Sequence, residues 1–275
     1  MSTPTTKCIF CGAAVNSAEH IFPRWSHRFM GPRPNARART YRGIETLAGR
    51  QGDLVRMPGQ LRDWKVECVC GGTGSSCNNG WMRELEDRAR PILSKLFTGR
   101  ACRLTVEEQS VVAGWGVLKA MVAEFEPGTH RPSVHHMQRW QFKRSQVPPR
   151  GWGVWIANIA AGSWPAEWVL HRGLMRSEKQ ILRDGNGKPT YFNCASTTQV
   201  IGSLLIATLH SPLPELPQKW SFSAKGSILR IWPATGNSIK WPPAPLSAHD
   251  ADIVAGTFLD WSRRIARASG GASRP

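Results

Sequence analysis

The stretch CIFCGAAVNSAEHIFPRW, Cys8–Trp25, decides how the first part of this chain folds. It begins with Cys8 and Cys11, two thiols at the C-x2-C spacing by which one turn of backbone grips a tetrahedral metal ion. A second group of thiols follows in CVCGGTGSSC, which holds Cys68, Cys70 and Cys77. Because four thiolates complete a structural zinc site, the sequence predicts one zinc ion shared by the two groups.

The choice of ligands within the second group depends on its secondary structure. The segment WKVEC, residues 64–68, alternates as a strand does, and Cys68 lies inside it. Cys77 lies at the start of a helix that we expect near Asn78, a common place for the last ligand of a zinc site. We therefore favour Cys70 over Cys68. The predicted zinc ligands are Cys8, Cys11, Cys70 and Cys77, and the alternative is a set of unrelated buried thiols.

The charge of the chain points to a polyanionic partner. Lys and Arg number 36 against 19 Asp and Glu, which gives a formal net charge of +17 and a pI near 10.4. Nucleic acid is the first candidate for such a partner, and an anionic membrane surface is the second. No segment reaches the roughly 18 uncharged apolar residues of a membrane span, so we expect no membrane insertion.

The cysteines also bear on location. The residues before Cys8 contain no apolar stretch, so we expect no secretory signal and a cytoplasmic protein. Thiols stay reduced in that compartment, where clustered cysteines favour a metal over disulfides.

Residues 31–62 are rich in arginine, with only Glu45 and Asp53 opposing it. Glycine and proline are scattered through this segment, which predicts a long loop rather than a helix. We expect its cations to contact phosphates rather than bases, and the alternative is a loop that is only solvated. The predicted nucleic-acid-binding residues are Arg33, Arg37, Arg39 and Arg42.

The rest of the chain predicts an α+β fold. Pro91 is expected to end or kink the helix that begins near Asn78. Thr105 and Glu108 form a capping box before an apolar helical pattern that reaches residue 125, and a second helix is expected over 133–143. Short apolar runs between residues 152 and 232, separated by Gly, Pro and Asn, predict an antiparallel sheet. We expect a metal-containing domain over 1–103 and an α+β accessory domain over 104–275, which would bind substrate or a partner.

The motifs, taken in order, resemble the HNH endonuclease family. They are the first thiol pair, EHIFPRW (19–25), the second thiol group and CNNGWMRELE (77–86). The resemblance implies an N-terminal ββα-metal domain of two strands and a helix around one catalytic divalent ion. It implies His20 as the general base, and Glu19 and Asn78 as ligands for Mg²⁺ or Mn²⁺. The thiolate zinc would then be structural.

This sequence departs from the family pattern in two places, the wide spacing between Cys70 and Cys77 and a missing asparagine. The family usually carries an asparagine, on or before the second strand, that orients the general base. Between His20 and Cys77 the chain offers only Asn35, in the arginine-rich segment. Neighbouring residues of a strand also face opposite sides, so Glu19 and His20 need a bend to serve one site.

Two functions follow from this resemblance. The first is a metal-dependent endonuclease that hydrolyses phosphodiester bonds, in DNA rather than RNA. The alternative is a catalytically impaired, zinc-stabilised protein that binds nucleic acid on the same scaffold.

Overall fold

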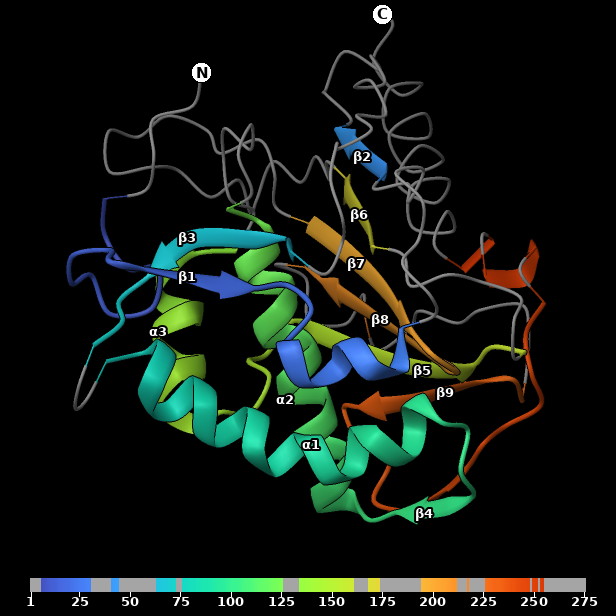
Figure 1. The fold of residues 1–275 in the computed structure, drawn as a ribbon. Coiled ribbons are helices and arrows are strands. Elements are labelled where there is room, and N and C mark those ends of the chain that lie inside the picture. The colour runs from blue at the N-terminus through green and yellow to red at the C-terminus, as the bar shows by residue number, and fades with distance from the viewer. Residues whose placement is uncertain are drawn as a thin grey trace, which may run out of the picture.

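The structure is a computed structural model, drawn in Figure 1. It describes residues 6–30, 63–72, 76–125, 134–160, 195–211, 217, 226–247, 249–251 and 253–254, and the backbone alone of 41–44, 168–173 and 194. Arg33, Arg37 and Arg39 lie outside the described residues, and Arg42 is described only as backbone.

Helices and antiparallel sheets are mixed in the described chain, so the fold is α+β. The helical segments are η1 (Arg24–Phe29), η3 (Asn78–Met82), α1 (Arg83–Phe97), α2 (Val106–Ala123) and α3 (His136–Ser145). The first strands are β1 (Ser17–His20), β2 (Tyr41–Ile44), β3 (Lys65–Val69), β4 (Cys102–Leu104) and β5 (Trp152–Asn158). The later strands are β6 (Trp168–Gly173), β7 (Cys194–Ile201), β8 (Leu204–His210), β9 (Ile228–Trp232) and β10 (Ile239–Trp241).

Three sheets form from these strands. A six-stranded sheet has the order β2-β6-β7-β8-β5-β9, and two-stranded sheets join β1 to β3 and β4 to β10. All described pairings of these strands are antiparallel except β2 with β6, which is parallel. The strand β2 corrects the prediction that all of residues 31–62 are loop, because backbone pairing with β6 fixes Tyr41–Ile44 as a strand.

Helix α2 lies at the centre of the described structure, with the large sheet on one side and α1 on the other (Figure 1). It begins at the predicted capping box, where Thr105 Oγ1 accepts from the amide of Glu108 at 3.1 Å. Every residue from Val112 to Ala123 is buried, as expected for a helix covered on all sides. Gly116 lets β8 approach closely, because a Cβ there would lie 2.6 Å from Ile206 Cδ1.

Helix α1 corrects one prediction. Pro91 does not end it, since the helix continues from Arg83 to Phe97. The pyrrolidine ring is exposed, while the opposite face buries Leu85, Ala89 and Leu93. Burial of that face against α2 outweighs the cost of a helix-interior proline, about 3 kcal/mol.

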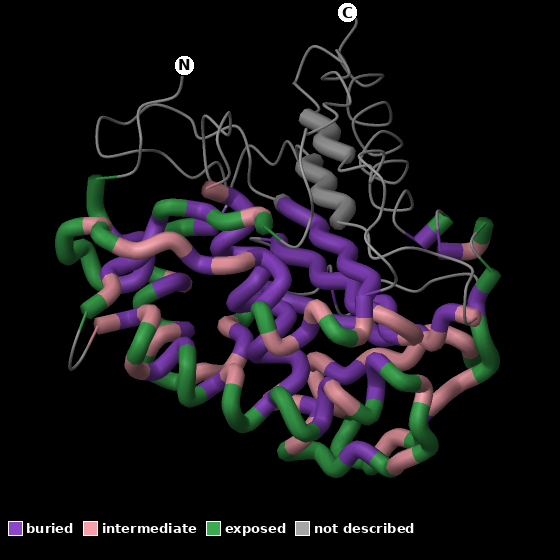
Figure 2. The backbone as a smooth tube through the Cα atoms, viewed as in Figure 1, coloured by how far each residue is buried: buried purple, intermediate pink, exposed green. Residues whose placement is uncertain are grey.

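One hydrophobic core crosses the predicted domain boundary at residues 103 and 104. A single cluster of buried side chains extends from Cys8 and Phe22 through Trp115 to Trp241, and the buried backbone runs through the middle of Figure 2. The division into two domains stays a prediction, although the described parts of both share this core. No described helix is long and apolar enough to cross a bilayer.

Candidate metal centre and adjoining cleft

Local backbone hydrogen bonds shape the first thiol pair into a knuckle. The amide of Gly12 donates to Cys8 O at 2.9 Å, and Gly12 takes the left-handed φ of +77° that this tight turn requires. The amide of Ile9 donates to Cys68 O at 3.0 Å and so ties the knuckle to β3. The turn of the sequence CIFCG therefore places Cys8 and Cys11 beside the end of β3.

The second pair is closed by its own backbone. The amide of Cys77 donates to Cys70 Sγ at 3.2 Å, and the amide of Asn78 donates to Cys70 O at 3.0 Å. These bonds bring residues 70 and 77 together across the glycine-rich segment between them.

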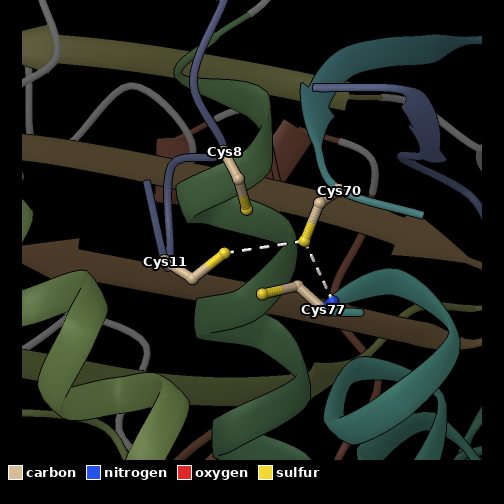
Figure 3. A group of neighbouring side chains, drawn as sticks. All are labelled: Cys8, Cys11, Cys70 and Cys77. Carbon is tan, nitrogen blue, oxygen red and sulfur yellow. Dashed lines mark hydrogen bonds between the residues drawn. The ribbon is translucent and has the colours of Figure 1, made fainter. Parts of the chain in front are cut away.

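The four thiols converge on one point (Figure 3). The Sγ atoms of Cys8, Cys11, Cys70 and Cys77 all lie within 4.8 Å of one another, and those of Cys11 and Cys70 are 3.5 Å apart. Four sulfurs around zinc would be spaced by about 3.8 Å, given Zn–S bonds of roughly 2.3 Å. The group could therefore hold a metal such as zinc. Cys68, the rejected alternative, lies outside the cluster, and burial raises the pKa of its thiol.

The thiols of the cluster are free rather than disulfide-bonded. The thiol of Cys77 hydrogen-bonds to Cys8 and lowers the pKa of Cys8 to about 4, while the same interaction raises the pKa of Cys77. A thiolate shared in this way is the species that a soft metal ion binds.

A cleft of about 700 Å³ adjoins the thiol cluster and brings the predicted catalytic residues together. Glu19 and His20 reach it from the end of β1, and Asn78 reaches it from η3. A register irregularity in β1, between Ser17 and Ala18, lies just before them. Such bulges re-aim side chains, and here two neighbouring residues of one strand both line the cleft.

The remaining lining of the cleft is mixed in character. Arg24 and Arg83 supply cations, and Trp25 and Met82 supply apolar surface. Glu86, one turn of α1 beyond Arg83, adds a second carboxylate that the sequence did not single out. The arginines of the cleft could thus bind a phosphate, and its carboxylate oxygens could bind a cation.

Asn78 is held so that its carbonyl oxygen is available. Its Nδ2 donates to Ser17 Oγ at 2.6 Å, which leaves Oδ1 for another partner. The segment that carries it, η3, is a π-helical turn interrupted at Gly80, where φ is −96° and ψ is −116°. Irregular turns of this kind occur often at functional sites.

The imidazole of His20 is half-buried and neutral at pH 7. Burial is the largest cause that lowers its pKa to about 4, and the nearby cations of Lys65, Arg24 and Lys119 contribute to that value. A neutral ring keeps a lone pair that can accept a proton. No described residue donates to or accepts from this ring through a hydrogen bond, so no described side chain replaces the orienting asparagine that β3 lacks.

Glu19 does not face the cleft alone. Its Oε1 forms a buried ion pair with Nζ of Lys119, from α2, and the same Nζ lies 2.5 Å from Glu86 Oε1. Lys119 also donates to the backbone carbonyl of His20 at 3.0 Å. Burial raises the pKa of the Glu19 carboxyl, with Lys119 opposing that change. Burial likewise opposes the charge on Lys119, but the two carboxylates outweigh it and raise its pKa.

The sequence missed Lys119 and Glu86, although each left a signal. Lys119 is the one basic residue in the apolar run GWGVLKAMVA, residues 114–123, where a buried charge needs partners. Glu86 lies eight residues beyond Asn78 on the same helical segment. Neither signal identifies the carboxylates with which Lys119 forms ion pairs.

A catalytic cation would have an incomplete set of protein ligands. Among the described residues, the four cysteines are the one group of three or more Cys, His, Asp or Glu side chains whose ligand atoms converge. Glu19 and Asn78 could together offer two oxygens. That number fits Mg²⁺, which is commonly bound by one or two carboxylates together with water and substrate phosphate.

Comparison with known proteins found no match to this chain, whether among family models, curated proteins or solved structures.

Proposed function

We propose that this protein is a metal-dependent endonuclease of the HNH type, which hydrolyses phosphodiester bonds in DNA. The observation that carries the proposal is the single cleft lined by Glu19, His20 and Asn78, residues that come from two elements 58 positions apart in the sequence (78 − 20 = 58). A neutral histidine, a carboxylate and an amide oxygen are the groups that this hydrolysis requires.

Each residue would have one task. His20 would accept a proton from the water that attacks phosphorus, and its low pKa keeps the ring unprotonated before the reaction. Glu19 and Asn78 would hold Mg²⁺ or Mn²⁺, and the cation would stabilise negative charge that develops on the phosphate and the leaving oxygen. Arg24 and Arg83 would hold the flanking phosphates, together with Arg33, Arg37, Arg39 and Arg42 of the arginine-rich segment.

Zinc at Cys8, Cys11, Cys70 and Cys77 would have a structural role in this proposal. It would join the first knuckle to the start of η3 and so fix β1 relative to Asn78. A cytoplasmic location, where these thiols stay reduced, belongs to the same proposal.

The runner-up is a protein that binds nucleic acid on this scaffold without cutting it. One observation favours it, which is that no described residue hydrogen-bonds to the His20 ring. A general base that is not oriented loses much of its catalytic effect, whereas binding through arginines would not change.

Nicking of supercoiled plasmid separates the two functions. Wild-type protein with Mg²⁺ or Mn²⁺ should convert supercoiled to open-circular DNA, and His20→Ala should be slower by about 10²–10⁴-fold. His27→Ala is the matched control, because His27 Nε2 donates to Phe22 O at 3.0 Å and this residue does not line the cleft.

The outcomes are distinct. Equal rates for wild type and His20→Ala would exclude His20 as the general base. Tight, salt-sensitive DNA binding without any cleavage would establish the binding protein instead.

A further inference from the structure

Lys119 is the most deeply buried cation of the described chain that touches the cleft residues. Its side chain has no exposed surface, and its ammonium group contacts three acceptors from two other elements: Glu19 Oε1, Glu86 Oε1 and His20 O. Its contacts to Glu19 Oε1 and His20 O are hydrogen bonds, and its contact to Glu86 Oε1 is an ion pair. Three groups from two elements therefore hold the ammonium group in place.

Stability alone does not account for this arrangement. Charges taken out of water lose several kcal/mol of hydration each, and buried ion pairs can often be replaced by apolar side chains at no cost. Lys119 lies in a stretch of α2 where every other side chain from Val112 to Ala123 is apolar or glycine. An apolar residue would suit that helix at least as well.

The contacts of Lys119 fall on both residues proposed for catalysis. It holds the Glu19 side chain by one carboxylate oxygen, and it holds the backbone of His20 at the last residue of β1. It engages only Oε1 of each carboxylate, so Lys119 does not occupy the second oxygen of Glu19. The hydrogen bond from Lys119 to the His20 backbone is important because no described residue holds the His20 ring by a hydrogen bond.

We propose that Lys119 is a positioning residue, which fixes the Glu19 carboxylate and the backbone of His20 from the neighbouring helix α2. It performs from a distant part of the chain the orienting task for which β3 offers no asparagine. This inference rests on the proposed function, and it adds that the cleft is incomplete without a residue of the second predicted domain.

Two variants separate positioning from simple charge balance. The bridge of two carboxylates and one ammonium carries a net charge of −1. The double variant Lys119→Met with Glu86→Gln loses one cation and one carboxylate, so its formal charge is still −1, but it lacks the contacts to Glu19 and His20. Glu86→Gln alone keeps both of those contacts.

A second buried ion pair, near the end of α2, provides a control for the loss of a buried charge. Arg139 of α3 pairs with Glu124, the residue that follows α2, at 3.3 Å between Nη1 and Oε2, and both side chains are buried. Neither residue lines the cleft. Arg139→Met should therefore lower stability without changing cleavage.

The experiment measures plasmid nicking, with kcat and KM determined separately, and Mn²⁺ affinity by electron paramagnetic resonance. Each variant is first checked for about one zinc per chain and for a cooperative thermal transition. The double variant should lose about 10–100-fold in kcat and in Mn²⁺ affinity, with KM for DNA within about twofold of wild type. Glu86→Gln should lose clearly less, and Arg139→Met should match wild type in all three quantities.

Several results would overturn the inference. A double variant that equals wild type in kcat and Mn²⁺ affinity, or that equals Glu86→Gln, would show that Lys119 only balances charge. Wild type that does not cleave, but binds Mn²⁺ more tightly than the double variant, would overturn the proposed function and keep the positioning role. Wild type that neither cleaves nor binds Mn²⁺ would overturn both.

Discussion

The thiol cluster and the lysine bridge (Lys119 with Glu19 and Glu86) are two polar groups that join distant segments of this chain in different ways. The cluster joins two local pairs, Cys8 with Cys11 and Cys70 with Cys77, each shaped by its own turn. The bridge joins single residues of β1, α1 and α2, and no two of its three charged side chains are near in sequence. A group built from local pairs can be recognised in the sequence by the spacing of its residues. A group built from single distant residues shows in the sequence only as isolated charges.

The two groups should also differ in energy. Four thiolates on zinc contribute folding free energy directly, of the order of 10–16 kcal/mol in zinc-finger peptides. A buried ion bridge contributes little net stability, but it costs much to break from one side. The cluster should therefore be needed for the fold, and the bridge for the geometry of the cleft.

The largest effect should come from removing a zinc ligand. Cys77→Ser should abolish zinc binding and lower the free energy of unfolding by more than about 5 kcal/mol, because the metal no longer joins the two thiol pairs. Metal analysis and urea unfolding measure both quantities. Cys68→Ser is the matched control, since this buried thiol lies outside the cluster: it should keep one zinc per chain and lose about 1–3 kcal/mol.

Breaking the bridge should have the next largest effect. Lys119→Met leaves the buried Glu19 and the half-buried Glu86 without their cation, and should cost about 3–5 kcal/mol in urea unfolding. Zinc content should stay at one per chain. Loss of zinc together with stability would mean that the two groups form one cooperative unit rather than two.

Acid should also lower the stability of the fold through His210, which belongs to neither group. This effect has to be measured before any pH dependence is assigned to the thiol cluster or the lysine bridge. His210 of β8 is buried beside Trp152, with ring centroids 5.1 Å apart, and burial lowers its pKa to about 3. The unfolded chain then binds a proton at its ordinary pKa of 6.5 while the folded chain does not. Stability should thus fall as pH drops from about 6.5 towards 3, by about 2 kcal/mol between pH 7 and pH 5 from this residue.

The check is urea unfolding of wild type and His210→Leu at both pH values. The variant should lose that part of the acid sensitivity. An equal loss in both proteins would place the acid sensitivity elsewhere, for instance at the thiol cluster.

The smallest effect should come from the rim of the cleft. Arg83 is exposed and pairs loosely with Asp87, at 3.8 Å between Nε and Oδ2. Arg83→Gln should weaken DNA binding by a few fold and reduce the slope of log affinity against log salt by about 1, as for one lost phosphate contact. Arg103→Gln, on β4 and outside the cleft lining, should leave that slope unchanged.

Local chemistry made part of this structure predictable. The capping box of Thr105 and Glu108 starts α2 as expected, because its partners are three residues apart. The strand over WKVEC and the helical segment from Asn78 also follow from local pattern. The choice of Cys70 over Cys68 rested on the alternation of β3, and the structure places Cys70 with the other three thiols.

Other features depend on contacts that a local pattern does not contain. Pro91 continues α1 because the buried face of that helix packs on α2. The strand β2 exists because β6, more than 120 residues away in sequence (168 − 44 = 124), pairs with it. In the sequence, Lys119 is an isolated charge in an apolar helix. Only the folded chain shows that it contacts Glu19 and His20.

The most direct test of the central claim is one metal experiment on the wild-type protein. Protein purified without added divalent ions is analysed for zinc and tested for nicking, and Mg²⁺ is then added. We predict about one zinc per chain throughout, no cleavage before the addition and cleavage after it. Cleavage without Mg²⁺ or Mn²⁺, or a chain that lacks zinc yet cleaves, would contradict a structural metal at the thiols and a catalytic cation in the cleft.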